Sequence, residues 1–281
     1  MEPGVPILGP DPPFSVREPE TDETPVVVEI PHAGLRVTPG SLATLIAPAR
    51  SLALDADLYV DQLYEDAPTH GATLLVSHVS RYVCDLNRAE QDVDSRAVAG
   101  TAAHHSPHGL VWVATTEGVP ALSRPLTRAE FRDRLENIYL PYHRALSALL
   151  ERKRRTFGFA VLLCGHSMPS RARGIGQRNR ADIVPGSRGR STAASDVIDC
   201  PDALARELGW SVAHDDPYRG GFTTAHYGNP SLAVHAVQVE ISRKRYMDEI
   251  GLVKLSNEFE QVRQYCGRLV ARLGALKLAS A

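Results

Sequence analysis

Nearly continuous apolar runs alternate along this chain with segments whose apolar residues recur at helical spacing. The apolar runs are rich in β-branched residues and predict four buried strands, at 25–30, 73–79, 159–167 and 234–242. Helical spacing predicts four helices, at about 55–67, 127–155, 200–208 and 256–273. Shorter strands are predicted at 182–184 and 210–216. Because strands and helices alternate, we expect an α/β fold with a mostly parallel sheet covered on both faces.

Two of the predicted helices carry residues that indicate where the helix begins or bends. Acidic residues occupy the first turns of the helix expected from residue 55, where the helix dipole favours negative charge. Thr127 and Glu130 have the spacing of a capping box at the start of the long helix. Pro141 lies inside that helix and predicts a kink, because proline has no backbone N–H to donate.

The composition is that of an ordinary globular protein and argues against two classes of partner. Of the 281 residues, 43% are hydrophobic and 23% are charged, and the formal net charge is −2. A nucleic-acid-binding domain would normally be clearly basic, and no apolar run approaches the length of a membrane span. With no internal repeat and no second composition regime, we expect an extended arm over residues 1–24 and a single domain over 25–281.

The cysteines and the N-terminus indicate a cytoplasmic protein. The four cysteines form no C-x-x-C pair, so the sequence indicates neither a zinc ribbon nor a thioredoxin-like motif. Cys84 and Cys164 lie in apolar runs and are expected to be small core residues. The N-terminal segment is rich in proline and acid and lacks the basic and apolar regions of a signal peptide. This pattern suits a reducing compartment.

Polar residues gather where the four long strands end. The segments are PHAG, SRYVCDLNR, GHS and EISR, in chain order. In open α/β sheets, ligands bind beyond the carboxyl ends of the strands, so we expect these segments to converge. The converging side chains would be His32, Arg81, Asn87, Arg88, His166 and Glu240.

This set of side chains has a chemical logic. Two histidines and a carboxylate make a zinc site that keeps one position open for water. A further glutamate can act on that water as general base and then as general acid. Arginine offers a planar fork that holds a carboxylate through two hydrogen bonds. The sequence therefore predicts a metal-assisted hydrolase that acts on a small acidic substrate.

The same segments belong to a longer series of motifs that occur in order. They are PHAG, D-x-D-x-x-V-D-x-L-Y, SRYVCDLNR, HSMPS, RGGFTTAHYG and AVQVEISRKRYMDE. By these motifs the chain resembles the N-formylglutamate amidohydrolase family over roughly residues 25–250. The resemblance implies a zinc-dependent amidohydrolase with a phosphorylase/hydrolase-like three-layer α/β sandwich and a mostly parallel mixed sheet. It also implies a small acidic N-acyl amino acid as substrate. N-formyl-L-glutamate, cleaved to L-glutamate and formate in histidine breakdown, is the first candidate.

The resemblance also implies which residues hold the Zn²⁺ ion. His32 of PHAG and His166 of HSMPS correspond to zinc ligands. The carboxylate ligand is expected from the segment DADLYVD, where Asp57 is our choice and Asp55 and Asp61 are alternatives.

Further roles follow from the same likeness. Glu240 corresponds to the catalytic glutamate of this fold, with an ion pair to Arg243 or Arg245 as the alternative interpretation. Asn87 and Arg88 resemble the Asn-Arg pair that holds the substrate carboxylate in aspartoacylase-like enzymes. Arg81 would bind a second carboxylate or polarise the scissile carbonyl, and Asp85 would orient one of the arginines.

The segment RGGFTTAHYG, residues 219–228, is expected to form a substrate loop. Its glycines let the backbone approach a ligand closely. Thr223, Thr224 and His226 offer hydrogen bonds there, and the alternative for His226 is a turn position.

Three features depart from the family pattern and bear mainly on the substrate. Cys164 stands where many relatives carry an aspartate that would orient a metal-binding histidine. Ala225 stands where relatives often carry an arginine, and segment 171–192 is unusually rich in arginine, which we expect to be solvated. Two alternatives to N-formylglutamate hydrolysis are therefore kept. One is cleavage of another N-acyl amino acid or peptide-like amide, and the other is a non-catalytic domain that binds an acidic metabolite.

Overall fold

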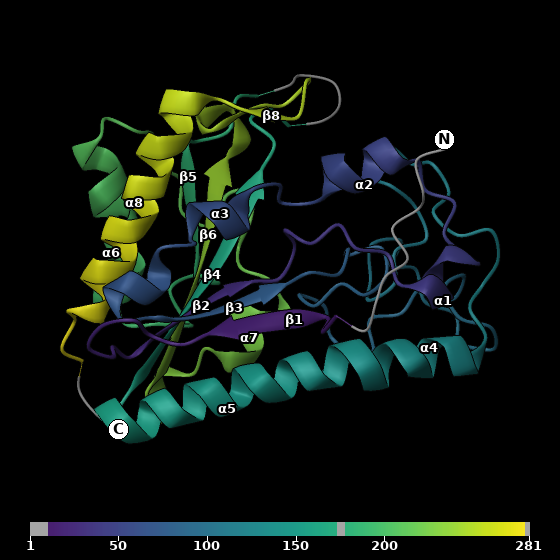
Figure 1. The fold of residues 1–281 in the computed structure, drawn as a ribbon, viewed down its shortest axis with the longest axis horizontal. Coiled ribbons are helices and arrows are strands. Elements are labelled where there is room, and N and C mark those ends of the chain that lie inside the picture. Colours follow the sequence, from purple (N-terminus) through teal and green to yellow (C-terminus); the bar gives the residue numbers. More distant parts are fainter. Residues whose placement is uncertain (1–10, 173–177, 279–281) are drawn as a thin grey trace.

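A mixed six-stranded sheet forms the centre of the computed structural model, which describes residues 11–172 and 178–278 (Figure 1). The strand order is β1-β3-β2-β4-β6-β5. Four parallel strands occupy the middle: β3 (Thr73–Ser77), β2 (Val26–Ile30), β4 (Ala160–Met168) and β6 (Val234–Ser242). The edge strands β1 (Phe14–Arg17) and β5 (Ile183–Gly186) pair antiparallel with their neighbours.

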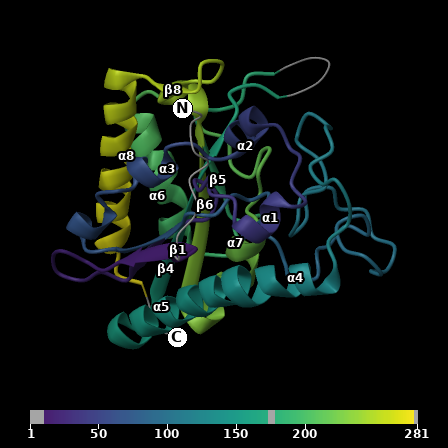
Figure 2. The ribbon, with the colours of Figure 1, turned by 45° about the vertical axis from the view of Figure 1, so that its right-hand side comes forward.

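Helices cover both faces of the sheet, and Figures 1 and 2 both place α6 and α8 on one side and α5 on the other. Residues Val26, Val28 and Ile30 pack in one core cluster with α6 (Ser195–Glu207) and α8 (Ser256–Gly274). Val27 packs in the other cluster with α5 (Leu140–Phe157), because successive strand residues point to opposite faces. This three-layer arrangement confirms the predicted fold class, and all four long strands form where the apolar runs predict them.

The remaining elements are short and connect these layers. They are α1 (Pro39–Leu42), α2 (Ala49–Asp55), α3 (Val60–Leu63), η1 (Ala67–His70), α4 (Arg128–Arg134), α7 (Phe222–Tyr227), η3 (Pro230–Leu232), η4 (Arg243–Arg245), β7 (Met247–Asp248) and β8 (Val253–Lys254).

The long helix predicted over 127–155 forms, with an irregularity just before its proline. The capping box is present, because the Thr127 side chain accepts from the Glu130 N–H and the Glu130 side chain accepts from the Thr127 N–H. Between α4 and α5 the chain makes a π-helical turn, η2 (Leu135–Tyr139). The helix α5 then begins at Leu140, one residue before Pro141. A π turn widens the helix locally. It therefore makes room for Pro141, whose missing N–H is the reason that we expected a kink in this helix.

Two sequence predictions of secondary structure are wrong. A continuous helix over 55–67 does not form, because Ala56 is extended and Tyr59 has a φ of 67°, so the chain is interrupted between α2 and α3. The expected strand at 210–216 is reduced to a single bridge between Val212 and Ile183.

The N-terminal segment contributes to the sheet where the structure describes it. Residues 14–17 of the expected arm form the edge strand β1, which pairs with β3, while residues 1–10 lie outside the described part of the chain. Among the described residues, no helix is both long enough and apolar enough to cross a membrane.

Candidate active site

A cavity of about 720 Å³ opens at the carboxyl ends of the parallel strands. Its wall includes residues that follow β2 and β3 and residues at the ends of β4 and β6. This is where open α/β sheets bind ligands. His32, Arg81, Asn87, Arg88, His166 and Glu240 all line it, so the structure brings together the whole set that the strand-end pattern predicts.

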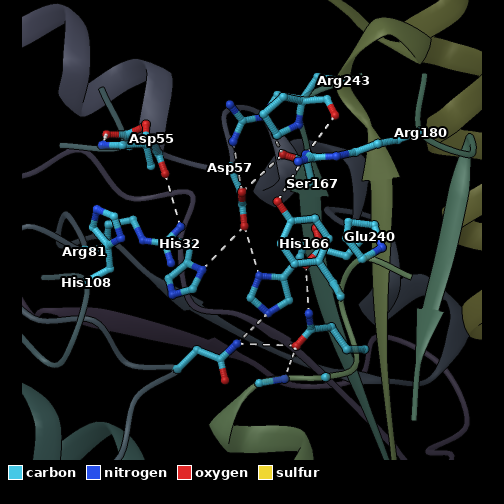
Figure 3. A pocket seen from close by; sticks show the side chains of 18 of the residues that line it. His32, Asp55, Asp57, Arg81, His108, His166, Ser167, Arg180, Glu240 and Arg243 are labelled. Carbon is cyan, nitrogen blue, oxygen red and sulfur yellow. Dashed lines mark hydrogen bonds and ion pairs between the residues drawn. The ribbon is translucent and has the colours of Figure 1, made fainter. Parts of the chain in front are cut away.

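His32, Asp57 and His166 form a buried group in the wall of the cavity (Figure 3). One ligand atom from each lies within 4.8 Å of the others. Asp57 Oδ2 lies 3.0 Å from His166 Nδ1 and 3.5 Å from His32 Nδ1. Two imidazole nitrogens and one carboxylate oxygen are a donor set that suits zinc.

The break between α2 and α3 is what places Asp57 in this group. With the chain extended at Ala56, the Asp57 N–H donates to the His32 carbonyl at 3.0 Å instead of continuing a helix. Arg243 then holds Asp57 Oδ1 at 3.2 Å. Burial alone would raise the pKa of the Asp57 carboxyl, but hydrogen bonds with His166 and His32 hold it well below its usual range.

The two alternative aspartates lie outside the group. Asp55 lines the cavity, but its carboxylate accepts from the Tyr82 hydroxyl at 2.5 Å and from the Thr116 N–H at 3.1 Å. Asp61 lies on α3, where burial raises the pKa of its carboxyl. Of the three aspartates, Asp57 is the one that joins His32 and His166.

His32 is oriented from behind by Asp85. Its Nε2 lies 2.7 Å from Asp85 Oδ1, which leaves Nδ1 facing Asp57. A carboxylate on the outer nitrogen of a histidine fixes the ring and strengthens the inner nitrogen as a ligand. Arg81 donates to Asp85 Oδ2 from Nε at 3.1 Å and from Nη2 at 2.8 Å, and its guanidinium lies over the Trp112 ring. Asp85 therefore orients Arg81, as the sequence indicates, and also His32.

His166 reaches the group from the end of β4, at a position that requires a glycine beside it. A Cβ on Gly165 would lie 2.6 Å from Ile30 Cδ1 and 2.8 Å from the Tyr64 ring, so any larger residue would have to displace these buried side chains. The outer nitrogen of His166, Nε2, lies 3.3 Å from Asn87 Nδ2.

Glu240 lies on β6 directly opposite His166 on β4. Its Oε1 accepts a hydrogen bond from Gln238 at 2.8 Å. Within the described residues it forms no ion pair, because Arg243 pairs with Asp57 and Arg245 pairs with Asp182. Burial raises the pKa of the Glu240 carboxyl to about 7, against the opposing charge of His166. A carboxyl with a pKa near neutrality can both accept and donate a proton.

Asn87 and Arg88 lie next to this group at different depths. Asn87 is buried, and its Oδ1 accepts from the Thr223 N–H at 2.9 Å, so only its Nδ2 amide faces the site. Arg88 is more exposed, and its nearest carboxylate, Asp92, lies 3.9 Å away. The guanidinium at the cavity wall therefore has only a long, weak pairing within the protein.

The RGGFTTAHYG segment lines the cavity with its first three residues, Arg219, Gly220 and Gly221, and not with the threonines and the histidine that were expected to bind the substrate. Gly220 and Gly221 line the cavity, while Thr224 and His226, on α7, are absent from its described lining. Thr224 is buried and donates to Cys164 Sγ at 3.6 Å, whereas His226 is exposed and stacks on Phe222 at 4.9 Å. The close approach that the glycines allow is to Asn87, because a Cβ on Gly221 would lie 2.2 Å from its Nδ2.

Several residues of the site were not identified from the sequence. They are Gln238, Arg243, Arg180, Trp112 and Tyr218. Arg243 follows β6 directly in the sequence ISRKR, so the strand-end argument could have included it. Arg180 lies in the arginine-rich segment, five of whose residues, 173–177, lie outside the described part of the chain, and nothing in the sequence separates it from its neighbours.

Comparisons with known proteins show the family of this chain and its likeness to solved structures. The family model described as N-formylglutamate amidohydrolase matches residues 24–247. The N-formylglutamate deformylases of Pseudomonas aeruginosa and Pseudomonas putida are each 35% identical to the chain over 235 residues, which is 80% of this chain and 83% and 82% of theirs. The crystal structure of an N-formylglutamate amidohydrolase from Ralstonia eutropha JMP134 superposes with a TM-score of 0.85 at 30% identity. That superposition covers 93% of this chain and 97% of the other.

Proposed function

Because this chain belongs to the N-formylglutamate amidohydrolase family, we propose that it is a zinc-dependent hydrolase that cleaves the amide bond of N-formyl-L-glutamate. One observation carries the proposal. A buried His–Asp–His group shares its cavity with a separate buried carboxyl, Glu240, that forms no ion pair with the described arginines. A domain that only bound an acidic metabolite would have no use for a carboxyl there.

His32, Asp57 and His166 would hold the ion, and their three donors leave a further position open, as in catalytic zinc sites. When bound, zinc would polarise the scissile carbonyl and make water nucleophilic near neutral pH. Glu240 would take the proton from that water and pass it to the leaving amine, which its pKa near 7 suits.

The arginines and Asn87 would position the substrate. Three of the five N–H groups of Arg81 are occupied by Asp85 and the Asp55 carbonyl, so two remain to polarise the substrate carbonyl oxygen. Asn87 Nδ2 and the Arg88 guanidinium would hold a carboxylate of the substrate at the cavity wall.

The direct test is release of formate from N-formyl-L-glutamate by zinc-loaded protein, in a panel with N-acetylglutamate and N-formylmethionine. We expect the formyl dicarboxylate to be the best substrate, and we expect chelation to abolish turnover and zinc to restore it. Cleavage of the acetyl compound alone would favour the other N-acyl amino acids. A protein that holds zinc but cleaves none of the panel would refute the proposal.

Metal content gives an independent measurement. We expect about one zinc per chain in the wild type and a large loss in His32→Ala and His166→Ala, because each variant removes one of three donors. His105→Ala is the matched control, since this histidine is exposed and lies outside the cavity. Undiminished zinc in both site variants would place the metal elsewhere.

A further inference from the structure

The cavity wall carries more arginines than its own carboxylates can pair. The arginines that line it are Arg81, Arg88, Arg180, Arg219 and Arg243. The carboxylates that line it are Asp55, Asp57 and Glu240. Arg243 is held by Asp57 at 3.2 Å, and Arg81 is held from behind the wall by Asp85 at 2.8 Å. Three arginines therefore remain without a close carboxylate among the described residues.

Arg180 differs from the other two because the protein fixes its orientation. Its Nη1 donates to the Pro169 carbonyl at 3.1 Å and to the Tyr218 hydroxyl at 3.2 Å. Its guanidinium carbon lies 5.3 Å from the centre of the Tyr218 ring. The side chain is half-buried, and its partners in the described part of the chain are a carbonyl and a hydroxyl rather than a carboxylate. A positive charge is thus held in place at the wall without a counter-charge.

The hydrogen bonds of Arg180 leave one edge of its guanidinium without an acceptor. Both bonds to the protein come from Nη1, while Nε is buried and has no hydrogen-bond partner. Two other arginines of this chain hold a carboxylate through their Nε and Nη2 edge: Arg81 holds Asp85, and Arg96 holds Asp94. A charged group whose donors lack acceptors is costly to bury. A substrate carboxylate beside Nη2, which has no hydrogen-bond partner among the described residues, would offset the charge and accept a charge-assisted hydrogen bond.

The position of Arg180 suits a substrate that spans the site. In Figure 3 it reaches toward the His32–Asp57–His166 group from the side of Glu240, whereas Arg81 and His108 lie on the other side. We propose that Arg180 is a specificity-determining residue that binds one carboxylate of an N-acyl dicarboxylic amino acid, while Arg88 binds the other. This inference rests on the proposed function and deepens it, because it explains selection of a substrate with two carboxylates.

The test compares one diacid with its two monoamides. We would measure kcat/KM of zinc-loaded wild type, Arg180→Gln and Arg180→Lys on N-formylglutamate, N-formylglutamine and N-formylisoglutamine. For the diacid we expect Arg180→Gln to lose about 10- to 100-fold, the usual size of a charge-assisted hydrogen-bond contribution. For the monoamide that lacks the carboxylate bound by Arg180, we expect little further loss. Arg180→Lys keeps the charge and should recover only part of the loss, because it lacks the two-point fork.

Arg178→Gln is the matched control. This arginine lies in the same segment, is exposed and does not line the cavity, so all three substrates should be unaffected. An equal penalty of Arg180→Gln on all three substrates would overturn the proposal, because it would show that Arg180 only supports Pro169 and Tyr218.

A binding measurement separates this inference from the proposed function. We would titrate glutarate into metal-free wild type, Arg180→Gln and Arg178→Gln by calorimetry, and we expect weaker binding only in Arg180→Gln. If the wild type does not hydrolyse N-formylglutamate, the proposed function fails, and glutarate still reports on Arg180. Equal glutarate affinity in all three proteins would overturn the role of Arg180 itself.

Discussion

Replacing Asp85 with asparagine would remove a buried charge that does not line the cavity but that hydrogen-bonds to four residues that do. The carboxylate is fully buried and accepts five hydrogen bonds. They come from His32 Nε2, Arg81 Nε and Nη2, the Asn87 N–H and Trp112 Nε1. Burial would raise the pKa of this carboxyl, but the charges of Arg81 and His32 hold it well below its usual range. An asparagine keeps the shape, yet its amide nitrogen must face at least two of these donors.

The structure lets us give the size of two separate effects. Breaking a buried ion pair by removing one partner typically costs about 3–5 kcal/mol. The Arg81 side chain keeps 16% of its surface exposed, so water relieves part of the penalty. We therefore expect the free energy of unfolding to fall by about 3 kcal/mol. Loss of the carboxylate behind His32 should also lower zinc affinity by about 10- to 100-fold.

Two assays separate these effects. Urea unfolding of metal-free protein reports the free energy of unfolding, and competition with a chelator reports zinc affinity. Asp94→Asn is the matched control, because Asp94 is also bound by an arginine through Nε and Nη2 but lies outside the cavity. We expect it to lower stability without changing zinc affinity. If Asp85→Asn binds zinc as tightly as the wild type, the orientation of His32 does not depend on Asp85.

Two further predictions concern buried carboxyls. Glu240→Gln should reduce kcat by about 10²–10⁴-fold, the usual contribution of a general base, while zinc content stays at the wild-type level; near-wild-type turnover would assign the proton transfer to another group. Glu29 is fully buried, and desolvation raises the pKa of its carboxyl, so the folded protein keeps the proton over a range where the unfolded chain has lost it. The wild type should therefore lose stability as pH rises above about 4.3, the unfolded value, toward the raised pKa. A glutamine at position 29 cannot ionise. The free energy of unfolding of Glu29→Gln should therefore rise relative to that of the wild type as pH increases through this range. Parallel pH profiles of the two proteins would contradict this reasoning.

The sheet and the long helices could be predicted because their sequence signals are local and strong. The run from Val234 to Ser242 is apolar enough to be recognised as a buried strand, and it forms β6 with those bounds. The helix α8 begins and ends within one residue of its expected range. In contrast, the interruption at Ala56 and Tyr59 could not be predicted, because acidic residues and apolar spacing there favour a helix. The helix yields because Asp57 bonds to the His32 backbone and to Arg243, both distant in sequence.

The strand-end rule predicted which segments meet but not how each side chain is used. It brought His32, His166 and Glu240 together, since parallel strands end at the same edge of the sheet. It could not show that α7 would turn His226 toward solvent, because a helix of six residues has too little pattern to define a buried face. Nor could it distinguish Arg180 from other arginines, since that depends on a contact with Tyr218.

Cys164 lies beside a buried carboxyl on the neighbouring strand. Glu29 on β2 pairs in register with Cys164 on β4, so their side chains point to the same face of the sheet. Both are fully buried, and the Tyr142 hydroxyl lies 3.1 Å from the Glu29 carboxyl. An aspartate at 164 would put two carboxyls side by side without water, where both cannot ionise. A thiol avoids this conflict, and it accepts a hydrogen bond from the Thr224 hydroxyl.

The two histidines of the site have different partners on their outer nitrogens. His32 has the carboxylate of Asp85 on its outer nitrogen, whereas the outer nitrogen of His166 lies 3.3 Å from the Asn87 amide. A carboxylate partner strengthens a histidine as a ligand, and an amide does so less. Arg243 fixes Asp57, whose Oδ2 lies 3.0 Å from the inner nitrogen of His166. The site thus keeps the geometry of its three donors with one supporting carboxylate behind His32 and none behind His166 among the described residues.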